Sequence, residues 1–241
     1  MSESESDQTP DNSQASPFLM RASALLGAQT LARLQGLHLL IVGVGAVGGA
    51  CAEALARSGV GRLTLIDGDC FEASNLNRQP FSSQSALGKP KVVVTCQQLA
   101  DRAPPCCVKG SIEFICADSV AARLEAIAPD AVIDAIDDFS AKVALLEACV
   151  RRKIPVWSAM GAARKLDPLS LKITDISKTQ VCPLARKVRQ ELRRRGIEKG
   201  IRCVWSAEPA APLHGDILGS YMPVTAAAGL VLAADVIACY R

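Results

Sequence analysis

Short apolar runs alternate with amphipathic stretches along most of the chain, and this pattern predicts strands and helices in turn. Strands are expected at residues 39–42, 63–66, 114–115, 131–138 and 155–159. Helices are expected at residues 49–57, from 91 onward, and at 119–127, 141–153 and 183–196. Before them, a helical element within residues 18–35 would line one face with four leucines, Leu25, Leu26, Leu31 and Leu34. The expected fold class is therefore α/β, a Rossmann-like, mainly parallel, doubly wound sheet.

The C-terminal third predicts two further features. Apolar residues alternate approximately over residues 161–175, which favours a strand hairpin and hence an antiparallel extension of the sheet. Residues 224–238 are apolar for about one helix, but they fall short of the roughly 20 residues that span a bilayer, and Asp235 interrupts them. We expect a core helix there and no need for a membrane.

The N-terminal residues 1–17 are rich in Ser, Asp, Glu, Gln and Pro and have almost nothing to bury, so they predict a disordered tail. Residues 18–241 then form a single domain. A polar, acidic start is not a signal peptide, which favours the cytoplasm and free thiols for the ten cysteines. No Cys-x-x-Cys pair occurs, so a four-cysteine zinc site is not expected.

The run at residues 39–42 leads directly into Gly43-x-Gly45-x-x-Gly48, and a helical stretch follows. A strand that enters a helix through such a turn presents backbone N–H groups to phosphate oxygens. Asp67 ends the next strand, nineteen residues after Gly48, where a dinucleotide-binding fold places the carboxylate that accepts ribose hydroxyls. A glycine-rich turn without a ligand would show the same glycines, but the carboxylate favours a bound nucleotide.

Polar and charged residues gather where the predicted strands end. Residues 68–80 form an irregular polar loop, and Lys91 begins the helix that follows it. Four carboxylates would lie on one edge of the sheet: Asp67, Asp69, Asp137 and Asp138. Carboxylates beside a bound phosphate often hold Mg²⁺. Two plainer roles stay open, with Asp138 as a helix N-cap and Lys91 as a solvated helix-end lysine.

Charge is distributed unevenly along the chain, whose formal net charge is +3. Residues 1–17 carry four acids, whereas residues 186–202 carry eight cations and two acids. Six cations project from the predicted basic helix: Arg186, Lys187, Arg189, Arg193, Arg194 and Arg195. They repel one another unless an anion lies nearby, and RNA would relieve that repulsion. The segment of about residues 177–203 is therefore a candidate RNA-binding segment, although a solvated charged face would look the same.

Five motifs together resemble the ThiF-type adenylating superfamily, which includes ubiquitin-activating enzymes and bacterial activators of sulfur-carrier proteins. They are Gly43-x-Gly45-x-x-Gly48, Asp67-Gly68-Asp69, Asn75-Leu76-Asn77-Arg78-Gln79, Gly88-Lys89-Pro90-Lys91 and Ile136-Asp137-Asp138. Within that superfamily the chain is similar to the tRNA threonylcarbamoyladenosine dehydratases at residues 54–61, 134–137, 151–155, 161–168, 175–179 and 183–185. Two positions depart from that pattern, with Ala46 in place of a further glycine and Cys182 in place of an aspartate.

The resemblance implies that the bound nucleotide is ATP rather than NAD. It assigns ATP contacts to Gly43, Gly45, Gly48, Asp67, Asp69, Asn77, Arg78, Gln79 and Lys91. Asp67 would hold the ribose, Arg78 and Lys91 the triphosphate, and Asp137 the Mg²⁺. Arg21 matches an arginine that reaches into the partner subunit's site in this superfamily, so a homodimer is implied. The candidate catalytic residues are thus Arg21, Arg78, Lys91 and Asp137.

The implied reaction activates a carboxylate on modified adenosine beside the tRNA anticodon. That carboxylate would attack the α-phosphorus of ATP to give an acyl-adenylate, and the neighbouring carbamoyl group would then close into a ring. Because the closure is intramolecular, no cysteine is needed as a nucleophile. A sulfur-transfer system with a cysteine desulfurase is a candidate partner. Two alternatives remain at this point, an activator of a ubiquitin-like or sulfur-carrier protein and a nucleotide-sensing module with a decayed site.

Overall fold

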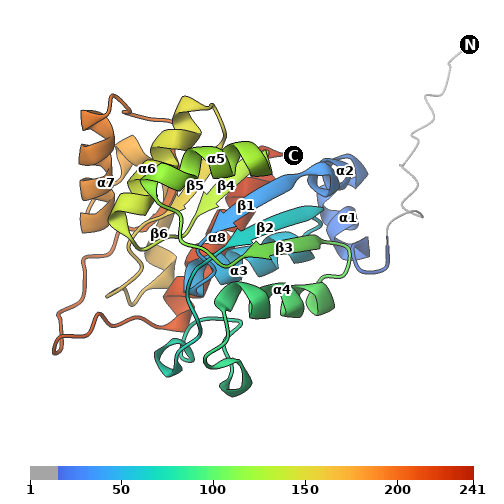
Figure 1. Ribbon diagram of the computed structural model, residues 1–241, viewed down its shortest axis with the longest axis horizontal. Coiled ribbons are helices and arrows are strands. Elements are labelled where there is room, and N and C mark those ends of the chain that lie inside the picture. The colour runs from blue at the N-terminus through green and yellow to red at the C-terminus, as the bar shows by residue number, and fades with distance from the viewer. Residues whose placement is uncertain (1–15) are drawn as a thin grey trace, which may run out of the picture.

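The central strand β1 (His38–Val42) is apolar along most of its length, and Leu39 to Val42 are buried on both faces of the sheet. In the computed structural model, which describes residues 16–241, seven strands form one sheet in the order β3-β2-β1-β4-β5-β7-β6 (Figure 1). Their bounds are β2 (Arg62–Ile66), β3 (Cys107–Ser111), β4 (Ala131–Asp134), β5 (Val156–Ala159), β6 (Leu171–Asp175) and β7 (Arg202–Ser206). All neighbours pair in parallel except β6 and β7. The mainly parallel α/β fold with an antiparallel end is therefore confirmed.

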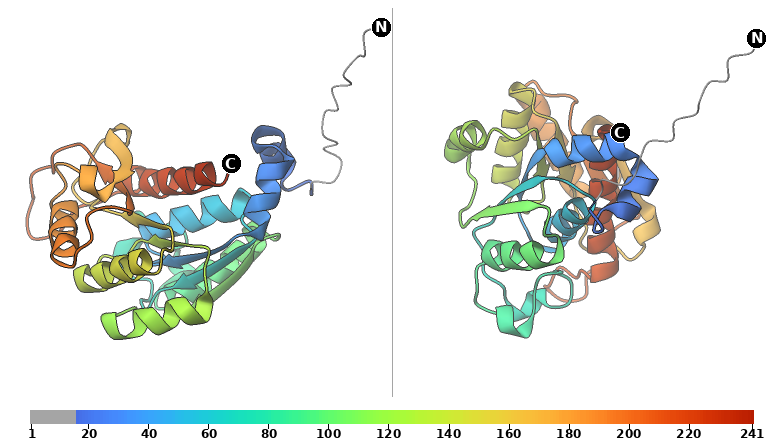
Figure 2. Two further views of the ribbon diagram at one scale, coloured as in Figure 1. Left: turned by 90° about the horizontal axis from the view of Figure 1, so that it is seen from above. Right: turned by 90° about the vertical axis from the view of Figure 1, so that its right-hand side faces the viewer.

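Helices cover both faces of the sheet. The helices are α1 (Met20–Leu26), α2 (Ala28–Gly36), α3 (Ala46–Arg57), α4 (Lys91–Arg102), α5 (Ala117–Ile127), α6 (Phe139–Arg151), α7 (Pro183–Arg194) and α8 (Met222–Cys239). Helices α3 and α8 lie on one side of the sheet and α5 and α6 on the other, as the left view of Figure 2 shows. Alternate residues of β1 therefore enter two separate cores, with Leu39 and Ile41 in one and Leu40 and Val42 in the other.

Helix α8 is the one helix in the described part of the chain that is long and apolar enough to cross a membrane by composition. It packs against α3 so closely that a Cβ at Gly229 would lie 2.4 Å from the carbonyl oxygen of Val47. The carboxylate of Asp235 accepts a hydrogen bond from Trp157 and pairs with Arg202 at 2.5 Å. The prediction of a core helix in this region is confirmed, and Asp235 joins it to the sheet.

Three predictions of local structure were wrong. The strand expected at residues 114–115 lies at Cys107–Ser111 instead, because β3 is an edge strand whose polar, half-exposed residues give no apolar run. Residues 161–175 form no hairpin, since β6 pairs with β7 across the intervening helix α7. The element within residues 18–35 breaks at Gly27, whose φ of +83° ends α1, and Leu25 is left 83% exposed. Residues 1–15 of the predicted disordered tail lie outside the described residues.

Candidate active site

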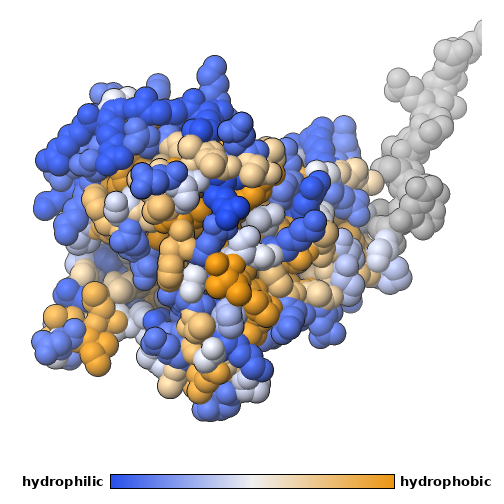
Figure 3. Space-filling view, viewed as in Figure 1, coloured by the Kyte–Doolittle hydropathy of each residue, from blue (hydrophilic) through white to orange (hydrophobic). Residues whose placement is uncertain are grey.

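A cleft of about 910 Å³ opens at the carboxyl ends of the central parallel strands, where ligands bind in open α/β sheets. It is lined by Gly43 and Gly45 of the glycine turn, though not by Gly48, and by Asp67 to Asp69, Arg78, Gln79 and Lys91. Residues 113–115, 135–138 and 159–163 also line it. Leu184 at the start of α7 and Leu218 in the loop between β7 and α8 complete the wall. That loop projects at the lower left of Figure 1, where Figure 3 shows apolar and polar residues together at its tip.

Packing requires glycine at two of the three glycine positions of the turn but not at the third. Gly43 has a φ of +89°, and a Cβ there would lie 2.6 Å from the carbonyl oxygen of Ala135. A Cβ at Gly48 would lie 1.8 Å from the carbonyl oxygen of Gly43, so both positions need glycine for the fold itself. At Gly45 a Cβ would meet only the side chain of Gln79, at 3.7 Å. Because packing does not demand Gly45, the open space beside it fits a ligand that approaches the backbone.

Gln79 gives a second sign of a ligand site. Its side chain is buried at the wall of the cleft, yet its Oε1 atom has no hydrogen-bond partner in the described structure. A buried amide oxygen left unpaired costs about 1–3 kcal/mol, so such atoms usually have a partner. The open space at Gly45 and the unpaired oxygen of Gln79 together fit a polar ligand such as a nucleotide.

Asp67 ties the loop after β2 to the glycine turn. Its two carboxylate oxygens accept hydrogen bonds from the backbone N–H groups of Val44 and Asp69, both at 2.8 Å. Burial raises the pKa of Asp67, and the two backbone hydrogen bonds oppose that shift. Each oxygen keeps a further lone pair, so the carboxylate can still accept hydroxyl groups of a ligand.

Lys91 is not a solvated lysine. It is the first residue of α4, is 7% exposed, and its Nζ lies 2.9 Å from Oδ2 of Asp69. The backbone N–H of Lys91 also donates to the carbonyl oxygen of Asp69, at 2.8 Å. The loop and the helix thus hold one cation at the wall of the cleft, where an anionic ligand would meet it.

Arg78 and Asn77 follow the short helix η2 (Ala73–Asn75) and act on two different parts of the site. Nη1 of Arg78 donates to the carbonyl oxygen of Ser74 at 2.7 Å and to Oδ1 of Asn77 at 3.0 Å. Nδ2 of Asn77 donates to the carbonyl oxygen of Ser220 at 2.9 Å. Arg78 lines the cleft, whereas Asn77 does not and instead joins Arg78 to the loop that carries Leu218. Asn77 therefore acts on the site through Arg78 in this structure.

The neighbouring carboxylates Asp137 and Asp138 have different surroundings. Asp138 is the N-cap of α6 and accepts a hydrogen bond from the backbone N–H of Ala141 at 2.7 Å. Asp137 is exposed on the cleft and has no side-chain hydrogen bond or ion pair within residues 16–241. No group of three His, Cys, Asp or Glu side chains suited to a metal occurs in that range. The single exposed carboxylate of Asp137 fits Mg²⁺, which needs only one or two protein carboxylates beside phosphate and water.

Arg21 lies far from the cleft of its own chain. It is exposed on α1, and the neighbouring Leu19 packs beside Gly59, just before the amino end of β2. The cleft opens at the other ends of the strands. The role expected for Arg21 in the site of a partner subunit stays a prediction.

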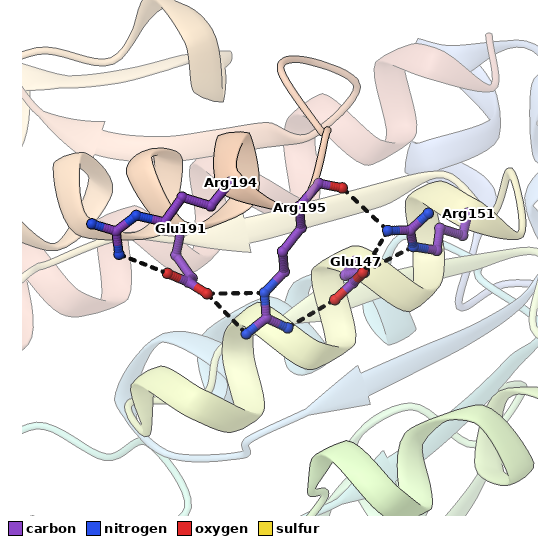
Figure 4. Close-up of polar contacts among 5 residues, drawn as sticks. All are labelled: Glu147, Arg151, Glu191, Arg194 and Arg195. Atoms are coloured by element: carbon purple, nitrogen blue, oxygen red, sulfur yellow. Dashed lines mark hydrogen bonds and ion pairs between the residues drawn. The ribbon is translucent and has the colours of Figure 1, made fainter.

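The basic helix α7 divides its cations into two groups. Arg189 donates to the carbonyl oxygen of Thr179 at 2.9 Å. Figure 4 shows that Arg194 pairs with Glu191, at 3.2 Å, and that Arg195 pairs with Glu147 of α6, at 2.8 Å. The other three, Arg186, Lys187 and Arg193, are exposed and have no ion pair in the described structure. The repulsion expected among the six cations is therefore relieved in part within the protein, by Glu191 of the same helix and by Glu147 of a helix distant in sequence.

The contact between α6 and α7 gives a prediction. Arg195 and Arg151 both bind Glu147, and the hydrogen bond from Arg195 is the main cause of its lowered pKa. A carboxylate with a lowered folded-state pKa stabilises the fold above its ordinary value of 4.5, and this contribution is lost as the pH falls through the folded-state pKa. Glu147→Gln should lower the free energy of unfolding by about 0.5–1 kcal/mol at pH 7.

Urea unfolding of Glu147→Gln and wild type at several pH values would check this expectation. The difference should shrink in acid, once the wild-type carboxyl is protonated. Glu198→Gln, which removes an exposed acid that forms no ion pair in the described structure, should have almost no effect. A difference independent of pH would contradict the ion-pair explanation.

Sequence reasoning missed several residues of the cleft. Glu113 pairs with Arg123 at 2.7 Å and leaves its buried Oε1 without a partner at the cleft wall within the described residues. Correct placement of β3 would have pointed to it, because residues after a parallel strand face the ligand edge. Nothing local in the sequence indicates that Leu218 reaches the cleft.

The comparisons with known proteins agree on the family. The ThiF family model matches residues 19–240. A protein of Bacillus subtilis (strain 168) named tRNA threonylcarbamoyladenosine dehydratase is 39% identical over 197 residues, which cover 82% of this chain and 77% of the relative. A protein of the same name from Escherichia coli (strain K12) is 37% identical over 191 residues, covering 76% and 71%. The solved structure of the E. coli tRNA N6-threonylcarbamoyladenosine dehydratase TcdA in complex with ATP superposes with a TM-score of 0.87 and 34% identity, over 92% of this chain and 93% of that chain.

Proposed function

This chain belongs to the ThiF family, and from that premise we propose that it is an ATP-dependent tRNA threonylcarbamoyladenosine dehydratase. The reaction consumes ATP as a substrate: the threonyl carboxylate of the modified adenosine attacks the α-phosphorus, pyrophosphate leaves, and an acyl-adenylate forms. The nitrogen or oxygen of the neighbouring carbamoyl group then closes onto the activated carbonyl and expels AMP. The modified nucleoside loses one water overall.

One observation carries the proposal. The chain matches the ATP complex of the E. coli dehydratase over nearly the whole length of both proteins, and its own cleft has a place for a nucleotide. Gly45 leaves open space and Gln79 an unpaired oxygen at the wall of that cleft. Similarity over the full domain supports a common reaction more strongly than a shared glycine motif does.

The proposed roles follow from the geometry of each residue. Asp67 accepts the ribose hydroxyls, and the backbone beside Gly43 and Gly45 donates to phosphate oxygens. Arg78 and Lys91 supply the positive charge that adenylyl transfer requires as negative charge develops on the phosphate. Asp137 would hold Mg²⁺, which would neutralise further phosphate charge. Its exposed carboxylate is suited to a hydrated ion.

No cysteine is assigned a chemical step. Cys182 and Cys203 are buried, and burial raises the pKa of Cys203, which keeps that thiol protonated. Because the carbamoyl group and the activated carbonyl belong to the same nucleoside, their proximity can drive ring closure without a protein nucleophile.

The proposal extends to partners. The exposed cations of α7 contact tRNA phosphates, and Leu184 in the first turn of α7 lies at the wall of the cleft, so bound RNA lies next to the nucleotide. Arg21 completes the active site of a second copy, which makes the active form a homodimer. We propose that the enzyme acts in the cytoplasm, with a cysteine desulfurase system as a candidate partner.

The test is AMP release from ATP and Mg²⁺, with and without tRNA that carries threonylcarbamoyladenosine, followed by mass analysis of the nucleosides. We expect AMP only with the modified tRNA and a nucleoside lighter by one water. AMP that appears only with a ubiquitin-like or sulfur-carrier protein would replace the proposal with the carrier-activating alternative. ATP binding without AMP from either substrate would support a nucleotide-sensing module.

A further inference from the structure

A fully buried ion pair lies beneath the cleft, and no step of the proposed reaction uses it. Lys142 of α6 and Asp134 at the end of β4 have side chains that are 0% exposed, and Nζ of Lys142 lies 2.6 Å from Oδ2 of Asp134. The hydroxyl of Ser158 in β5 donates to the same Oδ2 at 2.5 Å. Nζ also contacts Ser158 Oγ at 3.4 Å and the carbonyl oxygen of Ala159 at 3.0 Å. We call Asp134, Lys142 and Ser158 the buried triad.

Stability alone does not account for the buried triad. Removing two charges from water is costly, and apolar residues of similar size commonly give an equal or more stable fold at such positions. The surroundings are already well packed, because Val132 and Ile133 of β4 and Val156 and Trp157 of β5 are all buried. The two strands are also joined by backbone pairing from Val132 to Asp134. The presence of the triad is therefore explained by its contacts with the backbone.

Those contacts fix the turn that leads from β4 into the cleft. Oδ1 of Asp134 accepts a hydrogen bond from the backbone N–H of Ile136 at 3.0 Å. Ala135, Ile136 and Asp137 all line the cleft, and the carbonyl oxygen of Ala135 lies against Gly43 of the glycine turn. On the neighbouring strand, Lys142 holds the carbonyl oxygen of Ala159 at the point where β5 enters the cleft.

We infer that the buried triad is a positioning device that holds the turn between β4 and α6, and with it Asp137, in the geometry that binds a metal–nucleotide complex. Neither Asp134 nor Lys142 lines the cleft, so both act through the turn rather than on the substrate. The inference rests on the proposed role of Asp137 in holding Mg²⁺. It predicts that neutral replacement of the pair leaves the chain folded but weakens the metal site.

The test uses the whole chain, a non-hydrolysable ATP analogue and Mn²⁺ in place of Mg²⁺, with bound Mn²⁺ measured by electron paramagnetic resonance. Two variants probe the triad. Asp134→Asn combined with Lys142→Met removes both charges at nearly constant volume, whereas Ser158→Ala keeps both charges. Ser206→Ala is the matched control, because Ser206 is equally buried at the end of β7 but lies outside the triad. Urea unfolding and analogue affinity in EDTA are measured for each protein.

We expect the double variant to bind Mn²⁺ about 10–100-fold more weakly, as loss of residues that orient a metal ligand commonly does. Ser158→Ala should shift in the same direction by less, and Ser206→Ala should not shift. Analogue affinity in EDTA should change much less than Mn²⁺ affinity in all three, since Asp67 and the glycine turn do not need the metal. Wild-type Mn²⁺ affinity in Ser158→Ala, and in the double variant if it folds, would overturn the inference.

The same measurement separates this inference from the proposed function. Wild-type protein that binds no Mn²⁺ with the analogue would defeat the proposed metal role of Asp137 itself. If wild type binds Mn²⁺ and Asp137→Asn does not, the metal role stands, and the triad variants then decide the inference alone. Should the double variant fail to fold, Ser158→Ala decides it.

Discussion

Replacement of Asp137 by alanine is expected to lower the rate of tRNA-dependent AMP formation about a thousandfold and to leave the free energy of unfolding nearly unchanged. The carboxylate of Asp137 is exposed on the cleft and has no partner in residues 16–241, so the fold loses nothing when it is removed. The reaction, in contrast, loses the carboxylate that we propose holds Mg²⁺ beside the triphosphate. Steady-state AMP release and urea unfolding measure the two effects separately.

Asp138 provides the matched control one position away. Its carboxylate caps α6 through the N–H of Ala141 at 2.7 Å, so Asp138→Ala should lower the free energy of unfolding by about 1 kcal/mol. Its AMP release should fall much less than that of Asp137→Ala, because one Asp138 oxygen caps the helix and the proposed metal ligand is Asp137. Equal reduction of activity in the two variants would contradict the separate roles, as would a fully active Asp137→Ala.

Strands buried on both faces could be predicted from the sequence, because burial on both faces requires a continuous apolar run. This holds for β1, β2, β4 and β5, whose positions were predicted within a few residues. The glycine turn was also predictable, since Gly43 and Gly48 are demanded by contacts within the same short segment or at the end of the adjacent strand. In these elements the contacts that determine the structure lie close together in the sequence or follow from a continuous apolar run.

Edge elements could not be predicted in the same way. β3 contains Lys109 and Gly110 within five residues, so neither an apolar run nor a clear alternation marks it. β6 and β7 pair across α7, and no feature of residues 161–175 reveals that their partner strand lies beyond a helix. The pairing is set by the tertiary fold, which closes the long connection with the packing of α7 against α6.

The candidate site shows the same limit. The motifs correctly predicted that one cleft contains Asp67, Arg78, Lys91 and Asp137, because the ends of parallel strands share one edge of the sheet. The motifs could not show that Asn77 turns away to Ser220, or that Glu147 neutralises part of α7. Those contacts join residues 143 and 48 positions apart, and only the folded chain brings them together.

The division of cations on α7 leads to the second large effect. Arg186, Lys187 and Arg193 are exposed and unpaired in the described structure, whereas Arg189 and Arg195 hold α7 to its neighbours. Changing the three exposed cations together to glutamate should weaken tRNA binding about 100-fold at physiological salt, with the fold intact. Changing Arg195 instead would break the ion pair with Glu147 and mix a decrease in stability with a decrease in binding.

A matched control carries the same change in charge elsewhere. Arg33, Arg62 and Lys109 are exposed on α2, β2 and β3, near the other edge of the sheet, and form no ion pair within the described residues. Converting these three to glutamate should change tRNA affinity much less. Equal effects in the two triple variants would indicate a general influence of net charge rather than a binding face on α7.

Salt dependence gives the sharper readout, because each cation that binds a phosphate releases bound counterions. The slope of log Kd against log salt concentration should fall by about 0.7–0.9 for each phosphate-binding cation that is replaced, hence by about 2–3 in the α7 triple variant. The control triple variant should keep the wild-type slope. An unchanged slope and affinity in the α7 variant would remove this helix from the RNA interface, while AMP release would still report on the nucleotide site independently.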